Sequence, residues 1–383
     1  MSDWKVRYIE YASHYKSMRA EILAAVDDTL SRGDVMLRQQ LTDFESSLAE
    51  LCGTQYAVGM GNCTDALEIA LRAAGVGDGH EVITVAHTFV ATAAAIHHSG
   101  ATPVFVDIGD DHLMDVSKIE GAITPRTKAI MPVQLNGRIC DMDTVMQLAD
   151  KHDLVVIEDS AQALGATYKG RKAGSFGAAG CFSFYPAKLL GAFGDAGAVV
   201  TNDAEMNEKV RLLRNHGRTP ENEIAFWSFN SRMDNIHAAM LNVKIKRLPS
   251  WLERRRQLAA AYHTGMRDIP EVLLPPPPVD EGPHWDVFQN YEIEAEQRDR
   301  LFEYLKAAGV ETMITWGGKA VHQFKNLDFG DVRLPRTELM ISKVLMLPMY
   351  VELTEDQVEY VCGQVRLFYR GRKRTAKLAA AKG

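Results

Sequence analysis

Six short apolar or β-branched runs alternate with helical patterns over the first two-thirds of the chain. The runs are Val82–Ala86, Thr102–Ile108, Ala129–Leu135, Leu154–Ser160, Cys181–Tyr185 and Ala198–Asn202. Between several of them lie predicted helices over residues 64–75, 89–100 and 142–153. Strands that alternate with helices in this way form a mostly parallel sheet with helices on both faces. Because the strands are apolar at nearly every position, we expect both faces of the sheet to be buried.

The chain of 383 residues is long enough for two domains. A helical pattern runs from about Asp234 to Tyr262 and is followed by the prolines Pro270, Pro275–Pro278 and Pro283, which a helix interior does not tolerate. We therefore predict a large domain over residues 1–250 and a small C-terminal α+β domain over residues 251–383. The small domain is expected to end in a helix from Thr354 to about Tyr369, and its basic end is expected to be a solvated tail.

Composition excludes several classes of protein. No apolar run reaches the ~18 residues that a membrane span needs, and the charged N-terminus lacks the apolar core of a secretory signal. The net charge of −7 argues against binding to nucleic acid or to an anionic membrane surface. The five scattered cysteines contain no C-x-x-C pair, which predicts reduced thiols in a cytoplasmic protein. The histidines have no metal-like spacing, so no metal is expected.

A glycine-containing turn, VGMGNCTDAL (Val58–Leu67), leads into a predicted helix that begins near Thr64. Helix N-termini expose unpaired N–H groups and carry a partial positive charge, which suits a phosphate. An ordinary helix cap without a ligand remains the alternative for this segment on its own.

The segment VVIEDSAQALGA places Asp159 at the end of a predicted buried strand, three residues before Gln162. A carboxylate at such a position is costly unless it has a partner. It is either a helix cap or a group that holds a ligand.

The segment CFSFYPAKLLGAFGDAGAVV carries Ser183 and Lys188 around a strand end and a turn at Pro186. Lys188 lies in an apolar, glycine-rich context with no adjacent acidic residue. Burial there would lower the pKa of the lysine and make its amine nucleophilic, unless the side chain extends to the surface.

Together these segments match the needs of pyridoxal 5'-phosphate. This cofactor requires a lysine for a Schiff base, a carboxylate for the pyridine nitrogen and a cradle for the phosphate. Lys188, Asp159 and the helix end at Thr64 meet these needs, and Phe89 can stack on the ring. The combination is far more specific than any of its parts.

The sequence also resembles the sugar aminotransferases of the DegT/DnrJ/EryC1/StrS family over nearly its whole length. The resemblance is carried by GNCTDALEIALRAAG, VITVAHTFVATAAAI, VIEDSAQALGATYKGRKAGSFG, CFSFYPAKLLGAFGDAGAVVTND, LRNHGR and FNSRMDNIHAAML. It implies a three-layer fold type I architecture and a homodimer with active sites at its interface.

The resemblance also implies roles for individual residues. Lys188 would form the Schiff base, Asp159 would pair with the ring nitrogen and Gln162 would contact the phenolic oxygen. Further cofactor contacts would come from Ser183, Thr64, Asp65 and, across the dimer, Asn230. Phe89 and Cys63 are also candidate contacts, and Cys63 stands next to the phosphate turn where family members commonly have a small residue.

The implied reaction moves an amino group from L-glutamate to a keto-deoxysugar that is linked to a nucleotide, with pyridoxamine phosphate as the intermediate form. Two alternatives are another reaction of the same cofactor, as in a dehydratase branch that has histidine at the lysine position, and a non-catalytic regulatory relative. The presence of Lys188 with Asp159, Gln162 and Ser183 favours transamination.

Substrate contacts are the least determined part of the sequence. Where family members frequently read VHLYG this chain reads VQLNG, and the segment Thr312–Asn326 departs from the family pattern. The candidate substrate contacts are Gln134, Asn136, Arg232, Lys319 and His322. Whether the keto group lies at C3 or C4 of the sugar is left open.

Overall fold

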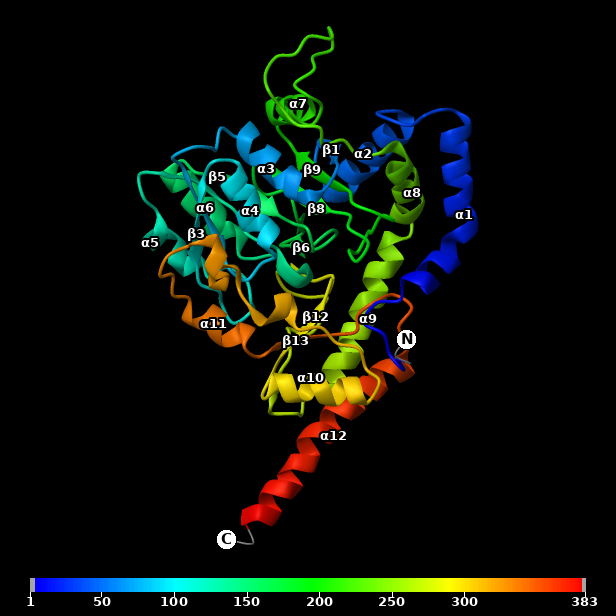
Figure 1. The fold of residues 1–383 in the computed structure, drawn as a ribbon, viewed down its shortest axis with the longest axis vertical. Coiled ribbons are helices and arrows are strands. Elements are labelled where there is room, and N and C mark those ends of the chain that lie inside the picture. Colours follow the sequence, from blue (N-terminus) through cyan, green and yellow to red (C-terminus); the bar gives the residue numbers. More distant parts are fainter. Residues whose placement is uncertain (1–3, 381–383) are drawn as a thin grey trace.

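A computed structural model describes residues 4–380, with side chains through residue 371. Its centre is a seven-stranded sheet (Figure 1). In spatial order the strands are β1 (Tyr56–Met60), β9 (Gly197–Thr201), β8 (Ala179–Ser183), β5 (Val155–Asp159), β4 (Thr127–Ile130), β2 (Glu81–Val85) and β3 (Thr102–Val106). Strand β9 is antiparallel to both neighbours, and the other pairs are parallel. The predicted mostly parallel α/β sheet is confirmed.

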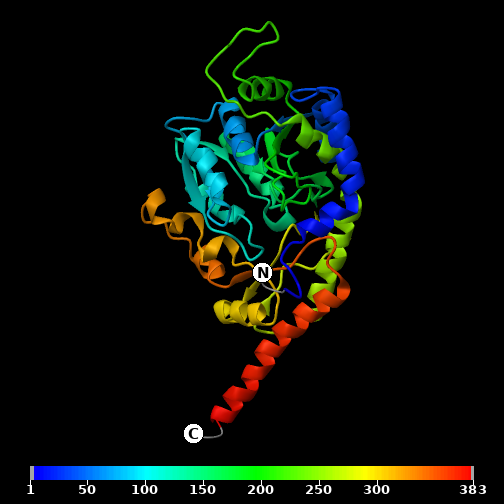
Figure 2. The same ribbon diagram turned by 45° about the vertical axis from the view of Figure 1, so that its right-hand side comes forward.

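Helices cover both faces of this sheet (Figure 2). One layer contains α1 (Tyr11–Ser31), α2 (Gln39–Cys52), α6 (Met142–His152) and α8 (Asn235–Ile245), and the other contains α3 (Cys63–Ala73), α4 (Val90–His98) and α7 (Ala204–Leu213). Successive side chains of a strand point to opposite faces. Accordingly, Ala198 and Val200 pack on the face of the sheet that α1, α2, α6 and α8 cover, and Val199 packs on the opposite face. This explains why the strands are apolar throughout.

A second hydrophobic core surrounds a three-stranded antiparallel sheet of β10 (Val272–Leu273), β12 (Tyr291–Ala295) and β13 (Val344–Leu347). It packs against α9 (Leu248–Met266), α10 (Arg298–Ala307) and α12 (Glu355–Ala380). The remaining elements are α5 (Ile119–Ala122), α11 (Pro335–Ile341) and a small ribbon of β6 (Thr167–Tyr168), β7 (Arg171–Lys172) and β11 (His284–Trp285).

Helix α9 belongs to both cores. Trp251 and Leu252 pack in the core around the large sheet, whereas Leu258 packs in the second core. The boundary expected at residues 250 and 251 therefore falls inside one continuous helix. Val6, near the N-terminus, also packs in the second core and forms a bridge with Val310. The division into two domains stays a prediction.

The single helix expected from Asp234 to Tyr262 is wrong, because the structure has two helices, α8 and α9. The cause is Pro249. In a continuous helix the ring of Pro249 would clash with the carbonyl of Ile245, and Pro249 has no N–H to donate to that carbonyl. Helix α8 ends at Ile245, and Pro249 occupies the first turn of α9, where proline is tolerated.

Two further boundaries differ from the sequence-based expectations. Strand β4 ends at Ile130 instead of Leu135, because Pro132 cannot donate to the ladder of a central strand. The last helix continues to Ala380 instead of ending near Tyr369 (Figure 1). Among residues 4–380, no helix is long and apolar enough to cross a membrane.

Candidate active site

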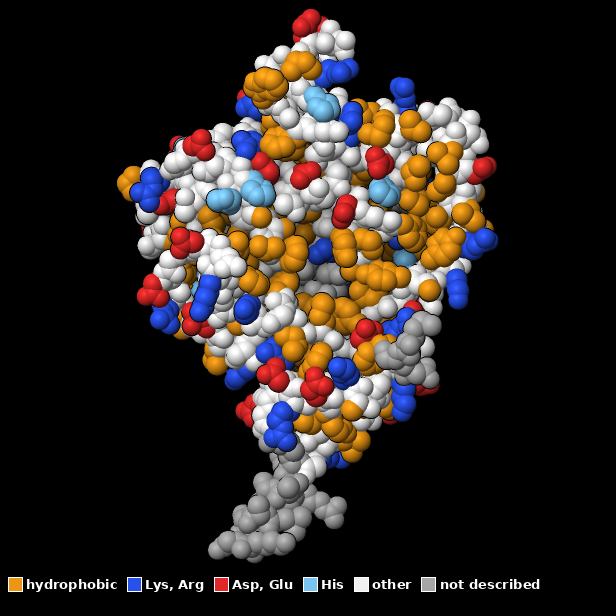
Figure 3. Space-filling model, viewed as in Figure 1, with side chains coloured by type: hydrophobic (Ala, Val, Ile, Leu, Met, Phe, Trp, Pro, Cys, Tyr) orange, Lys and Arg blue, Asp and Glu red, His pale blue; other side chains and the backbone are white. Residues whose placement is uncertain are grey.

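A cavity of about 500 Å³ lies where strands of the large sheet end. Asp159 is the last residue of β5 and Ser183 the last of β8, and both line the cavity. Ligands of open α/β sheets bind at the carboxyl ends of the strands. Of the predicted cofactor residues, the cavity brings together Cys63, Thr64, Phe89, Asp159, Gln162, Ser183 and Lys188. On the face seen in Figure 3, the surface is hollowed near its centre and apolar side chains surround the hollow.

Lys188 lies in the turn that follows β8. Its N–H donates to the carbonyl of Tyr185, and the Gln289 amide binds the backbone on either side of it, at Ala187 O and Leu189 N, at 2.8 Å each. No carboxylate of the described residues lies within ion-pair distance of its amine. Burial lowers the pKa of Lys188, and the nearby Cys63 and Asp159 oppose this change only partly. The backbone around Lys188 is therefore held firmly, and burial shifts its amine towards the neutral, nucleophilic form.

The carboxylate of Asp159 is only 5% exposed. Thr92 Oγ1 donates to its Oδ2 at 2.7 Å, and the Ala161 N–H donates to its Oδ1 at 3.2 Å. Burial nevertheless raises the pKa of Asp159, against the effect of these hydrogen bonds and of Lys188. A buried carboxylate that is only partly compensated favours a cationic partner, such as a protonated ring nitrogen.

The N-terminus of α3 forms another wall of the cavity. Asn62 caps the helix by accepting from the Asp65 N–H at 2.8 Å, and Asn62, Cys63 and Thr64 all line the cavity. The free N–H groups of this first turn suit an anion. Asp65 does not line the cavity, because its carboxylate accepts a hydrogen bond from Ser231 Oγ at 2.6 Å. It supports the turn from behind.

Gly197 permits the close approach of β9 to this turn. A Cβ at Gly197 would lie 2.4 Å from the carbonyl carbon of Asn62 and 2.6 Å from the backbone nitrogen of Cys63. The backbone at the start of α3 would then have to move.

We expect Gly197→Ala to weaken phosphate binding and to lower the free energy of unfolding by about 1–3 kcal/mol, the usual cost of overpacking. The measurements are cofactor affinity and thermal unfolding. Gly121→Ala is the matched control, because a Cβ there meets nothing within 4 Å. Equal behaviour of the two variants would contradict the role given to Gly197.

Gln162 and Asn136 form a hydrogen-bonded group with Asn290. The oxygen of Gln162 accepts from the Asn136 N–H at 2.9 Å and from Asn290 Nδ2 at 3.2 Å. Asn136, predicted to contact substrate, does not line the cavity but lies behind Gln162. Its backbone is in the left-handed region, with φ of +56°, which asparagine tolerates.

The other predicted substrate contacts are mostly outside the cavity. Gln134 borders it, but its amide is fully buried and binds Glu158 and the Cys140 N–H. Arg232 donates to Asn215 at 3.2 Å, Lys319 is exposed over the Phe324 ring, and His322 pairs with Glu338. None of these last three lines the cavity.

Asn230 lies outside the cavity of its own chain. It is exposed and forms a bridge with Asn215. The chain between these two residues, the projecting loop, extends from the top of the molecule in Figure 1. Cys63 borders the cavity as a buried thiol, and burial raises its pKa well above the ordinary value. It is therefore a neutral part of the wall.

Several cavity residues were missed by sequence reasoning. They are Tyr8, Asn62, Thr92, Gln289, Asn290, Met313, Trp316, Met346 and Met349. Asn62 could have been found, because it directly precedes the predicted helix and is a preferred cap residue. Met313 and Trp316 lie in the segment Thr312–Asn326, which was singled out as a whole but not residue by residue. The others come from distant parts of the chain and have no local signal.

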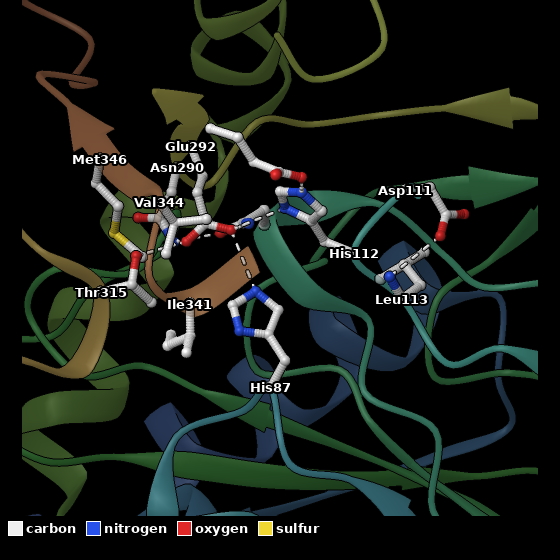
Figure 4. A network of polar contacts seen from close by, with 12 residues as sticks. His87, Asp111, His112, Leu113, Asn290, Glu292, Thr315, Ile341, Val344 and Met346 are labelled. Carbon is white, nitrogen blue, oxygen red and sulfur yellow. Dashed lines mark hydrogen bonds and ion pairs between the residues drawn. The ribbon is translucent and has the colours of Figure 1, made fainter. Parts of the chain in front are cut away.

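A cluster of charged residues next to the cavity was missed as well (Figure 4). Glu292 Oε1 lies 3.2 Å from His87 Nε2 and 3.1 Å from His112 Nδ1, and Thr315 Oγ1 donates to Glu292 Oε2 at 2.5 Å. His112 Nε2 in turn contacts Glu294 at 2.9 Å. These contacts raise the pKa of His112 to about 9 despite its burial. The side chains are close enough to hold a metal ion, but mutual pairing already neutralises them.

The fold and this site together define a fold type I aminotransferase. The chain belongs to the DegT/DnrJ/EryC1/StrS aminotransferase family, whose sequence model matches residues 16–366. It is 40% identical over 366 residues to a Streptomyces venezuelae dTDP-3-amino-3,4,6-trideoxy-α-D-glucose transaminase, covering 94% of this chain and 96% of the relative.

Two other comparisons agree. A UDP-N-acetyl-3-dehydro-α-D-glucosamine 3-aminotransferase of Acidithiobacillus ferrooxidans is 40% identical over 364 residues, which cover 95% of this chain and 98% of the relative. The crystal structure of S. venezuelae DesV in complex with a ketimine intermediate superposes with a TM-score of 0.91 at 39% identity, covering 95% of this chain and 98% of that one. The predicted family and enzyme class are confirmed.

Proposed function

We propose that the cavity binds pyridoxal 5'-phosphate and that the protein transfers an amino group from L-glutamate to a 3-keto sugar linked to a nucleoside diphosphate. The observation that carries the proposal is the meeting of Lys188, Asp159 and the N-terminus of α3 in one cavity. The residues fit the cofactor, because Lys188 lacks an acidic partner and the Asp159 carboxylate is incompletely compensated.

When bound, the cofactor supplies an electron sink for the charge that develops as a proton leaves the substrate carbon. Asp159 would keep the ring nitrogen protonated. The N–H groups of the first turn of α3, with Thr64 and Ser183, would hold the phosphate. Phe89 is 57% exposed and lines the cavity, so its ring would be available to stack on the cofactor.

Lys188 would hold the cofactor covalently in the resting enzyme. Its amine, once free, would be placed to take a proton from the α-carbon of the amino donor and to give it back, as general base and then general acid. The lowered pKa of Lys188 favours the neutral amine needed for the first of these steps. The two half-reactions, removal of the amino group from the donor and its transfer to the keto sugar, would share one site. The kinetics are therefore expected to be ping-pong.

We infer the identity of the amino-group acceptor from the relatives and from the side chains that line the cavity. Both transaminases compared above are named for position 3 of a nucleotide-linked sugar, which favours C3 amination. Trp316, Met313, Met346 and Met349 all line the cavity, and their apolar side chains suit a deoxygenated sugar face. Nucleotide-linked substrates and five free cysteines support a cytoplasmic location.

We infer that the enzyme is a homodimer. Apart from Lys188, the cavity lining within the described residues contains no lysine or arginine for a diphosphate, so a second copy is needed to supply cations or capping donors. The projecting loop exposes Ile224, Phe226 and a completely exposed Trp227. Apolar side chains also gather over α1 in Figure 3, where Leu23 and Leu30 are exposed. These surfaces suit a partner whose cofactor site Asn230 would complete.

Replacing Trp227 with aspartate is expected to weaken the dimer by at least ~10-fold, because the indole would lose its apolar contact with the partner. Sedimentation velocity over a dilution series measures the effect. The matched control is Leu339→Asp on α11, an apolar residue that is 52% exposed away from the projecting loop (Figure 1). A wild-type protein that is monomeric and fully active would contradict the shared site.

The proposed function is tested by following the visible absorbance of the purified protein. Addition of pyridoxal phosphate should produce a band that L-glutamate bleaches and that a 3-keto nucleotide sugar then restores. A band that glutamate does not change would overturn the amino-donor assignment. Restoration only by 4-keto sugars would overturn the assignment of C3.

A further inference from the structure

We propose that Asn136 and Asn290 are positioning residues that fix the Gln162 amide with its NH2 group facing the cavity. This inference rests on the proposed function, in which Gln162 contacts the phenolic oxygen of bound pyridoxal phosphate. It adds two residues that do not touch the cofactor's phenolic oxygen themselves but decide which end of the Gln162 amide meets it.

The orientation of Gln162 follows from a backbone group. The Asn136 N–H, which can only donate, lies 2.9 Å from Gln162 Oε1. The end of the amide at this position must therefore be the oxygen. Asn290 Nδ2 donates to the same oxygen at 3.2 Å, so Gln162 Nε2 is the end left for a ligand in the cavity.

The orientations of the two asparagines are fixed in the same way. The Glu292 carboxylate is ionised, because contact with the two histidines lowers its pKa despite its burial, so it only accepts hydrogen bonds. Asn136 Nδ2 donates to Glu292 Oε1 at 3.0 Å, which turns Asn136 Oδ1 towards Asn290 Nδ2, at 2.8 Å. The two asparagines thus donate to the Gln162 oxygen on one side, and Asn136 donates to Glu292 on the other.

The cluster in Figure 4 anchors this network. His87, His112 and Thr315 all contact the Glu292 carboxylate, and the His87 and Glu292 side chains are completely or almost completely buried. Glu292 lies on β12, whereas His87 and His112 come from loops of the large sheet. The charged cluster therefore joins the second core to the wall of the cavity and holds Asn136 in place.

A donor at the phenolic oxygen has a measurable consequence. It draws charge from that oxygen and weakens the oxygen's hold on the neighbouring proton of the lysine linkage. It therefore lowers the pH at which the visible absorbance of the bound cofactor changes. An amide that turns freely between its two ends gives this effect only in part.

The test is a spectroscopic pH titration of four holoenzymes: wild type, Gln162→Leu, Asn290→Leu and the double variant. We expect Gln162→Leu to raise the midpoint by about one pH unit and Asn290→Leu to raise it by a smaller amount. Because Asn290 acts through Gln162, adding Asn290→Leu to Gln162→Leu should cause no further shift.

Asn290→Ala provides a second variant if the leucine does not fit. Asn242→Ala is the control, since it removes an asparagine amide that donates to the Gln40 carbonyl outside the cavity. One contrary result is that Asn290→Leu shifts the titration midpoint equally in the wild-type and Gln162→Leu proteins, and another is that it shifts the midpoint in neither. Either result would overturn the positioning role and leave the proposed function intact. A wild-type protein without a visible band would overturn both.

Discussion

Lys188→Ala is expected to abolish multiple turnover while leaving the fold intact. Without the amine there is no covalent linkage to the cofactor and no group at this position to move the proton during transamination. The loss should exceed the 10²–10⁴-fold range typical of a single acid–base group, because two roles disappear at once. Steady-state production of 2-oxoglutarate measures the loss, and the visible band of the linked cofactor should be absent.

Lys172→Ala is a suitable control, since its amine only donates to the carbonyl of Gly165 at 3.3 Å and does not line the cavity. Circular dichroism and thermal unfolding check that both variants fold. Repeated turnover by Lys188→Ala with a keto sugar acceptor would remove Lys188 from its assigned position.

Asp159→Asn is expected to lower the turnover number by at least about 10²-fold. An amide cannot hold a positive charge on the ring nitrogen, and a neutral ring is a weaker electron sink. The substitution keeps the size of the side chain. The single oxygen of the asparagine can still accept from the Ala161 N–H, and its NH2 group would then face Thr92 Oγ1, a hydroxyl that can accept as well as donate. The rate of glutamate-driven bleaching in a single turnover isolates the effect from product release.

The Asp159→Asn variant should bind the cofactor and form the linkage to Lys188, since the phosphate site is untouched. A bleaching rate within a few-fold of wild type would mean that another residue tunes the ring. A variant that fails to bind the cofactor at all would show that the main role of Asp159 is in affinity.

Residues with a strong local signal could be placed from the sequence. Asp159 ends the apolar strand β5 and Lys188 lies in the turn after the apolar strand β8, and parallel strands bring such positions to one edge of the sheet. The central strands were found because burial on both faces makes them continuously apolar. In the structure Lys188 and Asp159 line the same cavity.

Residues that depend on long-range packing could not be placed. Gln289 binds the backbone of Leu189, next to Lys188, although Gln289 and Leu189 are 100 positions apart in the sequence. Asn290 and Gln162 are 128 positions apart. Neither Gln289 nor Asn290 has a local pattern that distinguishes it from a surface amide. Lys319 was a candidate substrate contact because it lies in the segment Thr312–Asn326, which departs from the family pattern. In the structure its side chain is exposed and does not line the cavity.

The most direct measurement is the transfer of isotope from ¹⁵N-labelled L-glutamate to a nucleotide-linked 3-keto sugar by the purified holoenzyme. The proposed function predicts that one ¹⁵N atom appears at C3 of the sugar for each 2-oxoglutarate formed, and that Lys188→Ala gives neither product. Mass spectrometry and NMR of the sugar read out the label and its position. Absence of label from every keto sugar on every nucleotide tested, with the cofactor bound and glutamate present, would contradict the account.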